Sequence, residues 1–289
     1  MFMKTFTGFC SRNWAVSAFC LVITVLFFTM PVMSLDHGAT WDELFSHKYG
    51  EHLINYYASF GADKSALNYK NLYLYGGFFE IIAELAVDIF NPLFDQNFTY
   101  EIRHVVNALI GVLAIFITGM VSRYFAGWKA GLLAVLLLAL SPRFLGHAMN
   151  NPKDIPFAAF YIMGAYFILK AVNQFPSTSR RTLYFLIASI ALAISIRIGG
   201  MLLICYFLLF IAIKVGYLLY KAKKDRGEQI FYVKKGVLTG LVVTLFSYFG
   251  GLVFWPYGLE GPLFHRFHAR QKVSQFSNVL SISVDGRQI

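Results

Sequence analysis

Long runs of apolar residues constrain this chain more than any other feature of its sequence. A helix needs about 20 consecutive apolar residues to cross the roughly 30 Å hydrocarbon core of a bilayer. Hydrophobic residues make up 57% of the chain and charged residues only 14%, which excludes an ordinary soluble domain. We predict an all-α, polytopic bundle of about seven transmembrane helices, whose apolar runs are residues 14–33, 103–122, 130–149, 155–172, 182–197, 199–219 and 236–255.

The first of these runs resembles a signal peptide in one respect, because Lys4 and Arg12 precede it. It is longer than an ordinary signal-peptide core, however, and the sequence "PVMSLD" offers no clear cleavage site with small residues. We therefore expect a retained helix whose N-terminus lies in the cytoplasm.

The distribution of charge supports the same orientation, because Lys and Arg collect on the cytoplasmic side of membrane proteins. With residue 1 inside, the cytoplasmic segments hold 14 of the 25 Lys and Arg residues and only two acidic ones. A basic cytoplasmic loop is expected at 220–235. The net charge of +10 is then a signal of topology, and it does not indicate a nucleic-acid partner.

The first outer loop, residues 34–101, is too long to be a simple connector, so we expect it to be functional. Its second half, 72–94, is apolar but carries Glu80, Glu84 and Asp88 at intervals of four residues. This spacing predicts an amphipathic helix that lies in the membrane interface. We expect its three carboxylates to face water, and we assign no chemistry to them.

Three clusters of polar residues lie at the outer ends of the predicted spans. They are Asp42 with Glu43, the segment from Arg143 to Asp154, and Arg197 between the fifth and sixth spans. Because the spans alternate in direction, we expect all three clusters to meet at one membrane surface.

Each cluster has a structural and a functional interpretation. Asp42 and Glu43 are either a solvated loop pair or a general base beside a ligand for a divalent cation or a sugar hydroxyl. Asp154 is either the N-cap of a helix that has Pro156 in its first turn or a metal ligand.

The cationic side chains are similarly ambiguous. Arg143, Lys153 and Arg197 either bind a phosphate at the lipid headgroups or extend to the interface without a ligand. Tyrosines of the first outer loop are typical of an interfacial aromatic belt. His265 and His268 alone are a weak zinc signal.

Four segments resemble the N-terminal half of GT-C type membrane glycosyltransferases, in the group of the protein O-mannosyltransferases and aminoarabinose transferases. They are "WDE" at 41–43, "EIRHVVNALIGVLAIF" at 101–116, "LLALSPRFLGHAMNNPKDIPFAAF" at 137–160 and "WPYGLEGP" at 255–262.

The resemblance implies transfer of a sugar from a polyprenyl- or dolichyl-phosphate donor to a hydroxyl of a protein or glycolipid acceptor. It implies catalytic roles for Asp42 and Glu43, and a divalent cation, Mg or Mn, held by Glu43 and Asp154. Arg143, Lys153 and Arg197 would bind the donor phosphate, with inversion at the anomeric carbon. Membrane lipids surround the bundle, and the active site would face the periplasm or lumen.

The chain also departs from this family pattern. A His-Pro-Pro-Leu type segment is replaced by "NYKNLYLYGGFFE", so the sugar and the acceptor are not carried over. Family members continue for several more helices, so we expect residues 1–256 to form the membrane module and 257–289 to be an outer segment of a truncated chain. The alternatives are a multi-span transporter or flippase, and an assembly subunit without catalysis.

Overall fold

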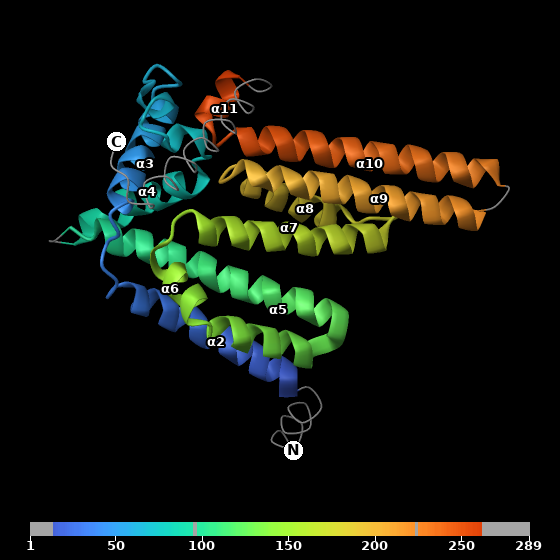
Figure 1. Cartoon of the computed structure of the whole chain (residues 1–289), viewed down its shortest axis with the longest axis horizontal. Helices are drawn as coiled ribbons and strands as arrows, with labels where there is room; N and C mark the ends of the chain where they lie inside the picture. Colours follow the sequence, from blue (N-terminus) through green and yellow to red (C-terminus); the bar gives the residue numbers. More distant parts are fainter. Residues whose placement is uncertain (1–13, 95–96, 223–224, 262–289) are drawn as a thin grey trace, which may run out of the picture.

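The computed structural model describes residues 14–94, 97–222 and 225–261, and the regular structure of these residues is entirely helical, with no strand among them. The predicted all-α fold is confirmed. The long helices lie side by side, and two short ones, α3 and α4, gather at one end of them (Figure 1). The helices are α2 (Trp14–Ser34), α3 (Glu43–Ala58), α4 (Phe78–Phe90), α5 (Thr99–Ala139), α6 (Pro142–Asn150), α7 (Asp154–Gln174), α8 (Arg180–Ile194), α9 (Met201–Ala222), α10 (Arg226–Leu252) and α11 (Pro256–Glu260).

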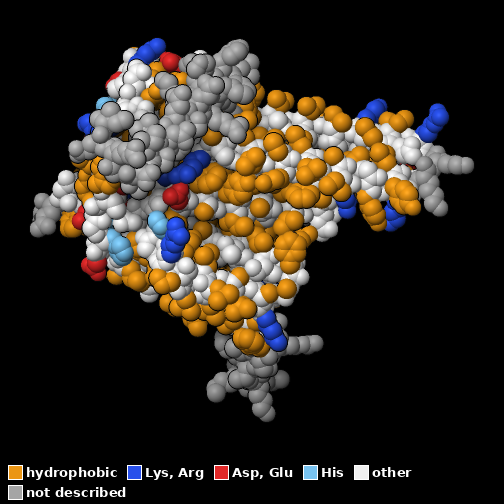
Figure 2. Space-filling model, viewed as in Figure 1, with side chains coloured by type: hydrophobic (Ala, Val, Ile, Leu, Met, Phe, Trp, Pro, Cys, Tyr) orange, Lys and Arg blue, Asp and Glu red, His pale blue; other side chains and the backbone are white. Residues whose placement is uncertain are grey.

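Within the described residues, five helices are long and apolar enough to cross a membrane: α2, α5, α7, α9 with its preceding turn, and α10. Figure 2 shows apolar side chains spread over the long helices and charged ones collected toward the ends. The α8 helix has 15 residues and is shorter than these five. We predicted about seven spans, and the described residues contain five helices that are long and apolar enough to be spans.

The third predicted span, 130–149, is not one helix. Its beginning agrees with the prediction, because the chain reverses inside α5 at Gly127, between the predicted second and third spans, where a φ of +79° favours glycine (Figure 1). The second arm of α5 ends at Ala139, and α6 begins at Pro142. Ser141 caps α6, because its side-chain oxygen accepts a hydrogen bond from the backbone N–H of Phe144. The Ser-Pro dipeptide thus divides the apolar run.

The predicted basic loop at 220–235 is also wrong, because most of these residues are helical. The α9 helix continues to Ala222, and α10 begins at Arg226. Asp225 caps α10 by accepting hydrogen bonds from the backbone N–H groups of Gly227 and Glu228. Lysines are good helix formers, so a basic composition did not by itself indicate a loop.

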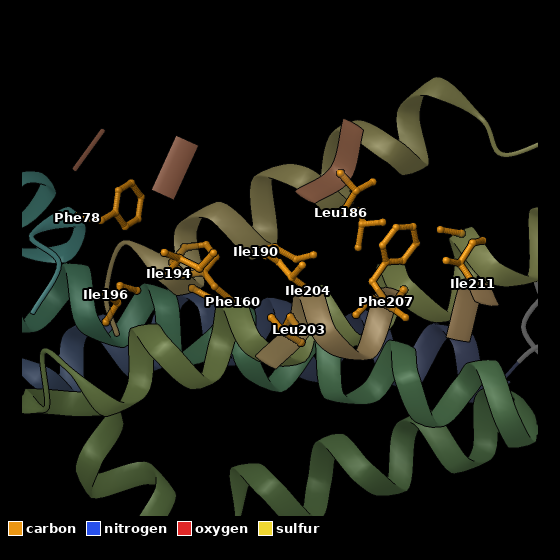
Figure 3. Packing of buried hydrophobic residues seen from close by; sticks show 14 of the residues in the cluster. Phe78, Phe160, Leu186, Ile190, Ile194, Ile196, Leu203, Ile204, Phe207 and Ile211 are labelled. Atoms are coloured by element: carbon orange, nitrogen blue, oxygen red, sulfur yellow. The ribbon is translucent and has the colours of Figure 1, made fainter. Parts of the chain in front are cut away.

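Two hydrophobic cores hold the bundle together. One lies among α7, α8, α9 and α10 and includes Phe160, Ile190, Leu203 and Phe207 (Figure 3). The other packs α2 against α5 and α6, with Phe19 at its centre. The two cores follow the order of the chain. The helices α2, α5 and α6 form one half of the bundle, and α7 to α10 form the other.

Residues 37–94, which we call the α3–α4 layer, are attached to the bundle by backbone hydrogen bonds. The N–H of Gly76 donates to the carbonyl of Ile196, 3.3 Å away, and the N–H of Phe78 donates to that of Ser195, also 3.3 Å away. At a second point the N–H of Gly77 donates to the carbonyl of Phe254 at 2.8 Å. The layer is therefore fixed both to the α8–α9 turn and to the end of α10.

We expect Gly76→Ala to destabilise the protein. A Cβ at this position would lie 1.9 Å from the carbonyl oxygen of Ser195, and backbone cannot rotate away as a side chain can. Overpacking of this kind costs about 1–3 kcal/mol or more. The midpoint of thermal unfolding in detergent measures the effect. Gly38→Ala is the control, because a Cβ on Gly38 meets nothing within 4 Å, and equal midpoints for both variants would contradict the prediction.

Candidate functional site

An ionic cluster is buried between α4 and the start of α5. The two terminal nitrogens of Arg103 divide between two carboxylates: Nη2 pairs with Oε2 of Glu80, and Nη1 lies 3.0 Å from Oε2 of Glu84. Nδ1 of His47, on α3, lies 2.9 Å from the same Glu84 oxygen. Glu80, Glu84 and Arg103 are 4%, 3% and 3% exposed. These four residues, the Arg103 cluster, join α3, α4 and α5.

The prediction that the acidic stripe of α4 faces water is therefore wrong for two of its three members. Only Asp88 is exposed. A buried carboxylate needs a partner, and here Arg103 supplies it from about 20 residues farther along the chain. Burial raises the pKa of the Glu80 carboxyl, against the opposing influence of Arg103 and Lys153. The helix itself was predicted correctly, but its polar face packs inward.

The acidic pair at the start of α3 is divided between water and the interior. Asp42 is half-buried, and its Oδ1 lies 2.8 Å from the hydroxyl oxygen of Thr40. Glu43 is 3% exposed, and its Oε2 lies 2.8 Å from Nε2 of His104. The Thr40 hydroxyl is also 2.8 Å from Oε1 of Glu43. The interpretation as a solvated pair therefore fails for Glu43, while Asp42 reaches solvent.

A second group of charges lies where α7 begins beside the α8–α9 turn. Oδ1 of Asp154 is 2.7 Å from Nη2 of Arg197. The ring of Tyr75 is near two cations, with Nζ of Lys153 5.7 Å and Cζ of Arg197 5.9 Å from its centroid. Asp154 is the first residue of α7, and Asn151 supplies the capping oxygen, which accepts from the N–H of Asp154 at 2.9 Å. Asp154 thus pairs with Arg197 and does not act as the N-cap.

The structure leaves other predicted site residues apart. Arg143 is exposed on α6 and takes no part in the contacts described above. Glu43 and Asp154 have separate partners, so a shared divalent cation would have to compete with His104 and Arg197 for their oxygens. The divalent cation stays a prediction, and we assign no step to it. His265 and His268 lie outside the described residues.

Among the described residues, a different set places three possible metal ligands together: atoms of His47, Glu51 and Glu84 lie within 4.8 Å of one another. Two cations already pair with these carboxylates, because Arg103 contacts Glu84 and Lys48 contacts Glu51. Positive charge at this position opposes the binding of a metal ion. This group therefore belongs to the contacts that hold α3 on α4.

Two small recesses lie side by side at this end of the bundle. Each has room for no more than about one water molecule. They share Phe79 and Pro152 in their walls, so the first adjoins the second. The His104 recess is lined by Glu43, Phe79, Arg103, His104, Asn107, Asn150 and Pro152, and the Lys153 recess by Tyr49, Leu72, Tyr75, Gly76, Phe79, Glu80, Pro152, Lys153 and Ile196.

Sequence reasoning missed Arg103, His104 and Asn107, all of which are buried. The apolar run at 103–122 predicts only that a membrane helix begins at these residues. The sequence did contain a signal for these residues. Polar and charged side chains cost free energy inside a membrane helix, so they are rare there and usually have a partner or a function. Their positions, three and four residues apart, also place them on one face of α5.

The comparison with protein families identifies this chain. The family model described as dolichyl-phosphate-mannose-protein mannosyltransferase matches residues 81–249. The matched region contains Arg103, His104, Asp154 and Arg197, whereas the acidic pair at 42–43 precedes it. No curated protein and no solved structure matches the chain. The chain belongs to the dolichyl-phosphate-mannose-protein mannosyltransferase family.

Proposed function

We propose that this protein transfers a sugar from a polyprenyl- or dolichyl-phosphate donor to an acceptor hydroxyl on the non-cytoplasmic face of a membrane. Members of its family are glycosyltransferases that use a dolichyl-phosphate-mannose donor. The observation that carries the proposal is that Glu43 and Lys153 line adjoining recesses, so acidic and cationic groups meet at one end of the bundle.

In this mechanism Lys153 and Arg197 bind the donor phosphate, since ammonium and guanidinium groups both suit phosphate oxygens. Asp42, which reaches solvent, takes the proton from the acceptor hydroxyl as general base. The hydroxyl oxygen attacks the anomeric carbon from the side opposite the phosphate, the carbon–oxygen bond to phosphate breaks, and the configuration inverts. The phosphate leaves with the electron pair, and the two cations stabilise its charge.

Two neighbouring acids have supporting roles. Asp154 holds Arg197 through their 2.7 Å contact and so orients the guanidinium toward the phosphate. Glu43 is kept in place by His104 and lines the recess that adjoins the phosphate site. The α3–α4 layer would face the periplasm or lumen, which places the basic ends of α9 and α10 in the cytoplasm.

A transporter or flippase is the competing function. It predicts that the decisive charges lie near the middle of the spans. Here Asp154 is the first residue of α7, Arg197 lies between α8 and α9, and Glu43 is the first residue of α3. Their position at helix ends favours a transferase, which acts where the lipid phosphate meets water.

The test is release of lipid phosphate by the purified protein supplied with dolichyl-phosphate mannose or other polyprenyl-phosphate sugars, with and without divalent cation. We expect release with at least one donor. Arg197→Gln is expected to lower kcat/KM about 10- to 100-fold, because a hydrogen bond to a charged group contributes about 1.5–3 kcal/mol.

The control is Arg181→Gln, which removes an exposed arginine from the other end of the bundle. Equal activity of the two variants would contradict the role of Arg197. An absence of release with every donor would contradict the transferase and favour a transporter or an assembly subunit.

A further inference from the structure

Two buried polar atoms on α5 have no hydrogen-bond partner. They are Nδ1 of His104 and Oδ1 of Asn107. The two residues are 2% and 1% exposed, and both line the His104 recess. Because they are three residues apart on one helix, they lie on the same face. A buried polar atom that is not hydrogen-bonded is costly, so two of them beside one recess point to a bound polar group.

The neighbouring contacts fix which atoms are available. Nε2 of His104 is engaged by Glu43 at 2.8 Å, which leaves Nδ1 free. The amide nitrogen of Asn107 donates to the carbonyls of His147 and Ala148, at 3.1 and 3.0 Å. This sets the orientation of the amide, because its oxygen must then point away from α6. Asn107 therefore offers an acceptor to the recess.

The walls of the recess also limit the charge of its ligand. Arg103 lines it and disfavours a cation, while Glu43 and the carbonyl oxygen of Asn107 disfavour an anion. The space admits a single small group. A hydroxyl fits these conditions when the His104–Glu43 pair carries hydrogen on both ring nitrogens, because it then accepts from Nδ1–H of His104 and donates its single hydrogen to Oδ1 of Asn107.

We propose that the His104 recess binds one hydroxyl group of the donor sugar, between Nδ1 of His104 and Oδ1 of Asn107. The inference rests on the proposed function, in which Lys153 and Arg197 bind the donor phosphate. The sugar is covalently attached to that phosphate, and the His104 recess adjoins the Lys153 recess through Phe79 and Pro152.

Two substitutions of His104 separate this role from its contact with Glu43. In His104→Gln the side-chain amide takes the place of Nε2, so the contact with Glu43 is kept and Nδ1 is lost. In His104→Asn the amide takes the place of Nδ1, so the recess keeps a polar atom and the contact with Glu43 is lost.

The measurement is the affinity of the purified protein for a short-chain mannosyl lipid phosphate and for the same lipid phosphate without sugar. We expect His104→Gln to weaken binding of the sugar-bearing lipid about 3- to 10-fold and to leave the sugar-free lipid unchanged. His104→Asn should keep the preference for the sugar-bearing lipid, although it should lose activity.

Other outcomes would overturn the proposal. If His104→Gln changes neither affinity, or weakens both equally, the recess holds only water or supports the fold. A sugar preference that depends on His104 without release of lipid phosphate would leave the subsite standing and refute the transferase. If the unaltered protein releases lipid phosphate but its preference for the sugar-bearing lipid does not depend on His104, the subsite is refuted and the transferase is not.

Discussion

Replacing Arg103 by Met is expected to lower the free energy of unfolding by about 3–5 kcal/mol, because it leaves the Glu80 and Glu84 carboxylates buried without their cation. The lost contacts join α4 to α5, so the α3–α4 layer should separate from the bundle first. Thermal unfolding in detergent measures the global effect, and limited proteolysis of residues 37–94 measures the local one.

Two comparisons make this prediction specific to the buried charge. Arg181→Met removes an exposed arginine and should change stability by less than about 0.5 kcal/mol. Combining Arg103→Met with Glu80→Gln and Glu84→Gln should recover much of the loss, since no ionised group is then left unpaired. A single Arg103→Met variant as stable as Arg181→Met would show that the cluster contributes nothing.

Asp42→Asn is expected to lower kcat about 10²- to 10⁴-fold, the usual contribution of a general base, with little change in thermal stability. Stability should change little because Asp42 is half-buried and its described side-chain hydrogen bond is with the Thr40 hydroxyl. The amide oxygen of Asn can still accept that hydrogen bond. The measurement is the rate of lipid-phosphate release at saturating donor, together with the midpoint of thermal unfolding.

Glu43→Gln provides the contrast for Asp42→Asn. Glu43 is buried against His104, so its replacement should lower both stability and activity. If Asp42→Asn leaves kcat unchanged while Glu43→Gln abolishes it in a folded protein, Glu43 and not Asp42 is the base.

Much of the fold was predictable because it depends on local composition. The apolar runs predicted the long helices, and the spacing of Glu80 and Glu84 predicted α4. The interruption at Arg197 correctly separated α8 from α9. These signals lie within single segments and need no knowledge of what packs against them.

The errors concern partners that are distant in the sequence. Glu80 and Glu84 of α4 are buried because they pair with Arg103, and no pattern within 72–94 indicates this pairing. Likewise, the sequence does not distinguish Asp42 from Glu43, whereas in the structure Glu43 contacts the distant His104. The break at Ser141-Pro142, inside the predicted span 130–149, was missed for a different reason, since this dipeptide is a weak signal against a background of good helix formers.

The hydroxyl of Thr40 has only one hydrogen, yet it lies equally close to an oxygen of Asp42 and an oxygen of Glu43. It cannot donate to both carboxylates at once, so at any instant one of the two acids lacks the hydrogen bond from Thr40. When Thr40 donates to Glu43, Oδ1 of Asp42 can accept a hydrogen bond from another group instead. Rotation about a single threonine side-chain bond would thereby select which of the two adjacent acids has an oxygen open to an incoming hydrogen-bond donor.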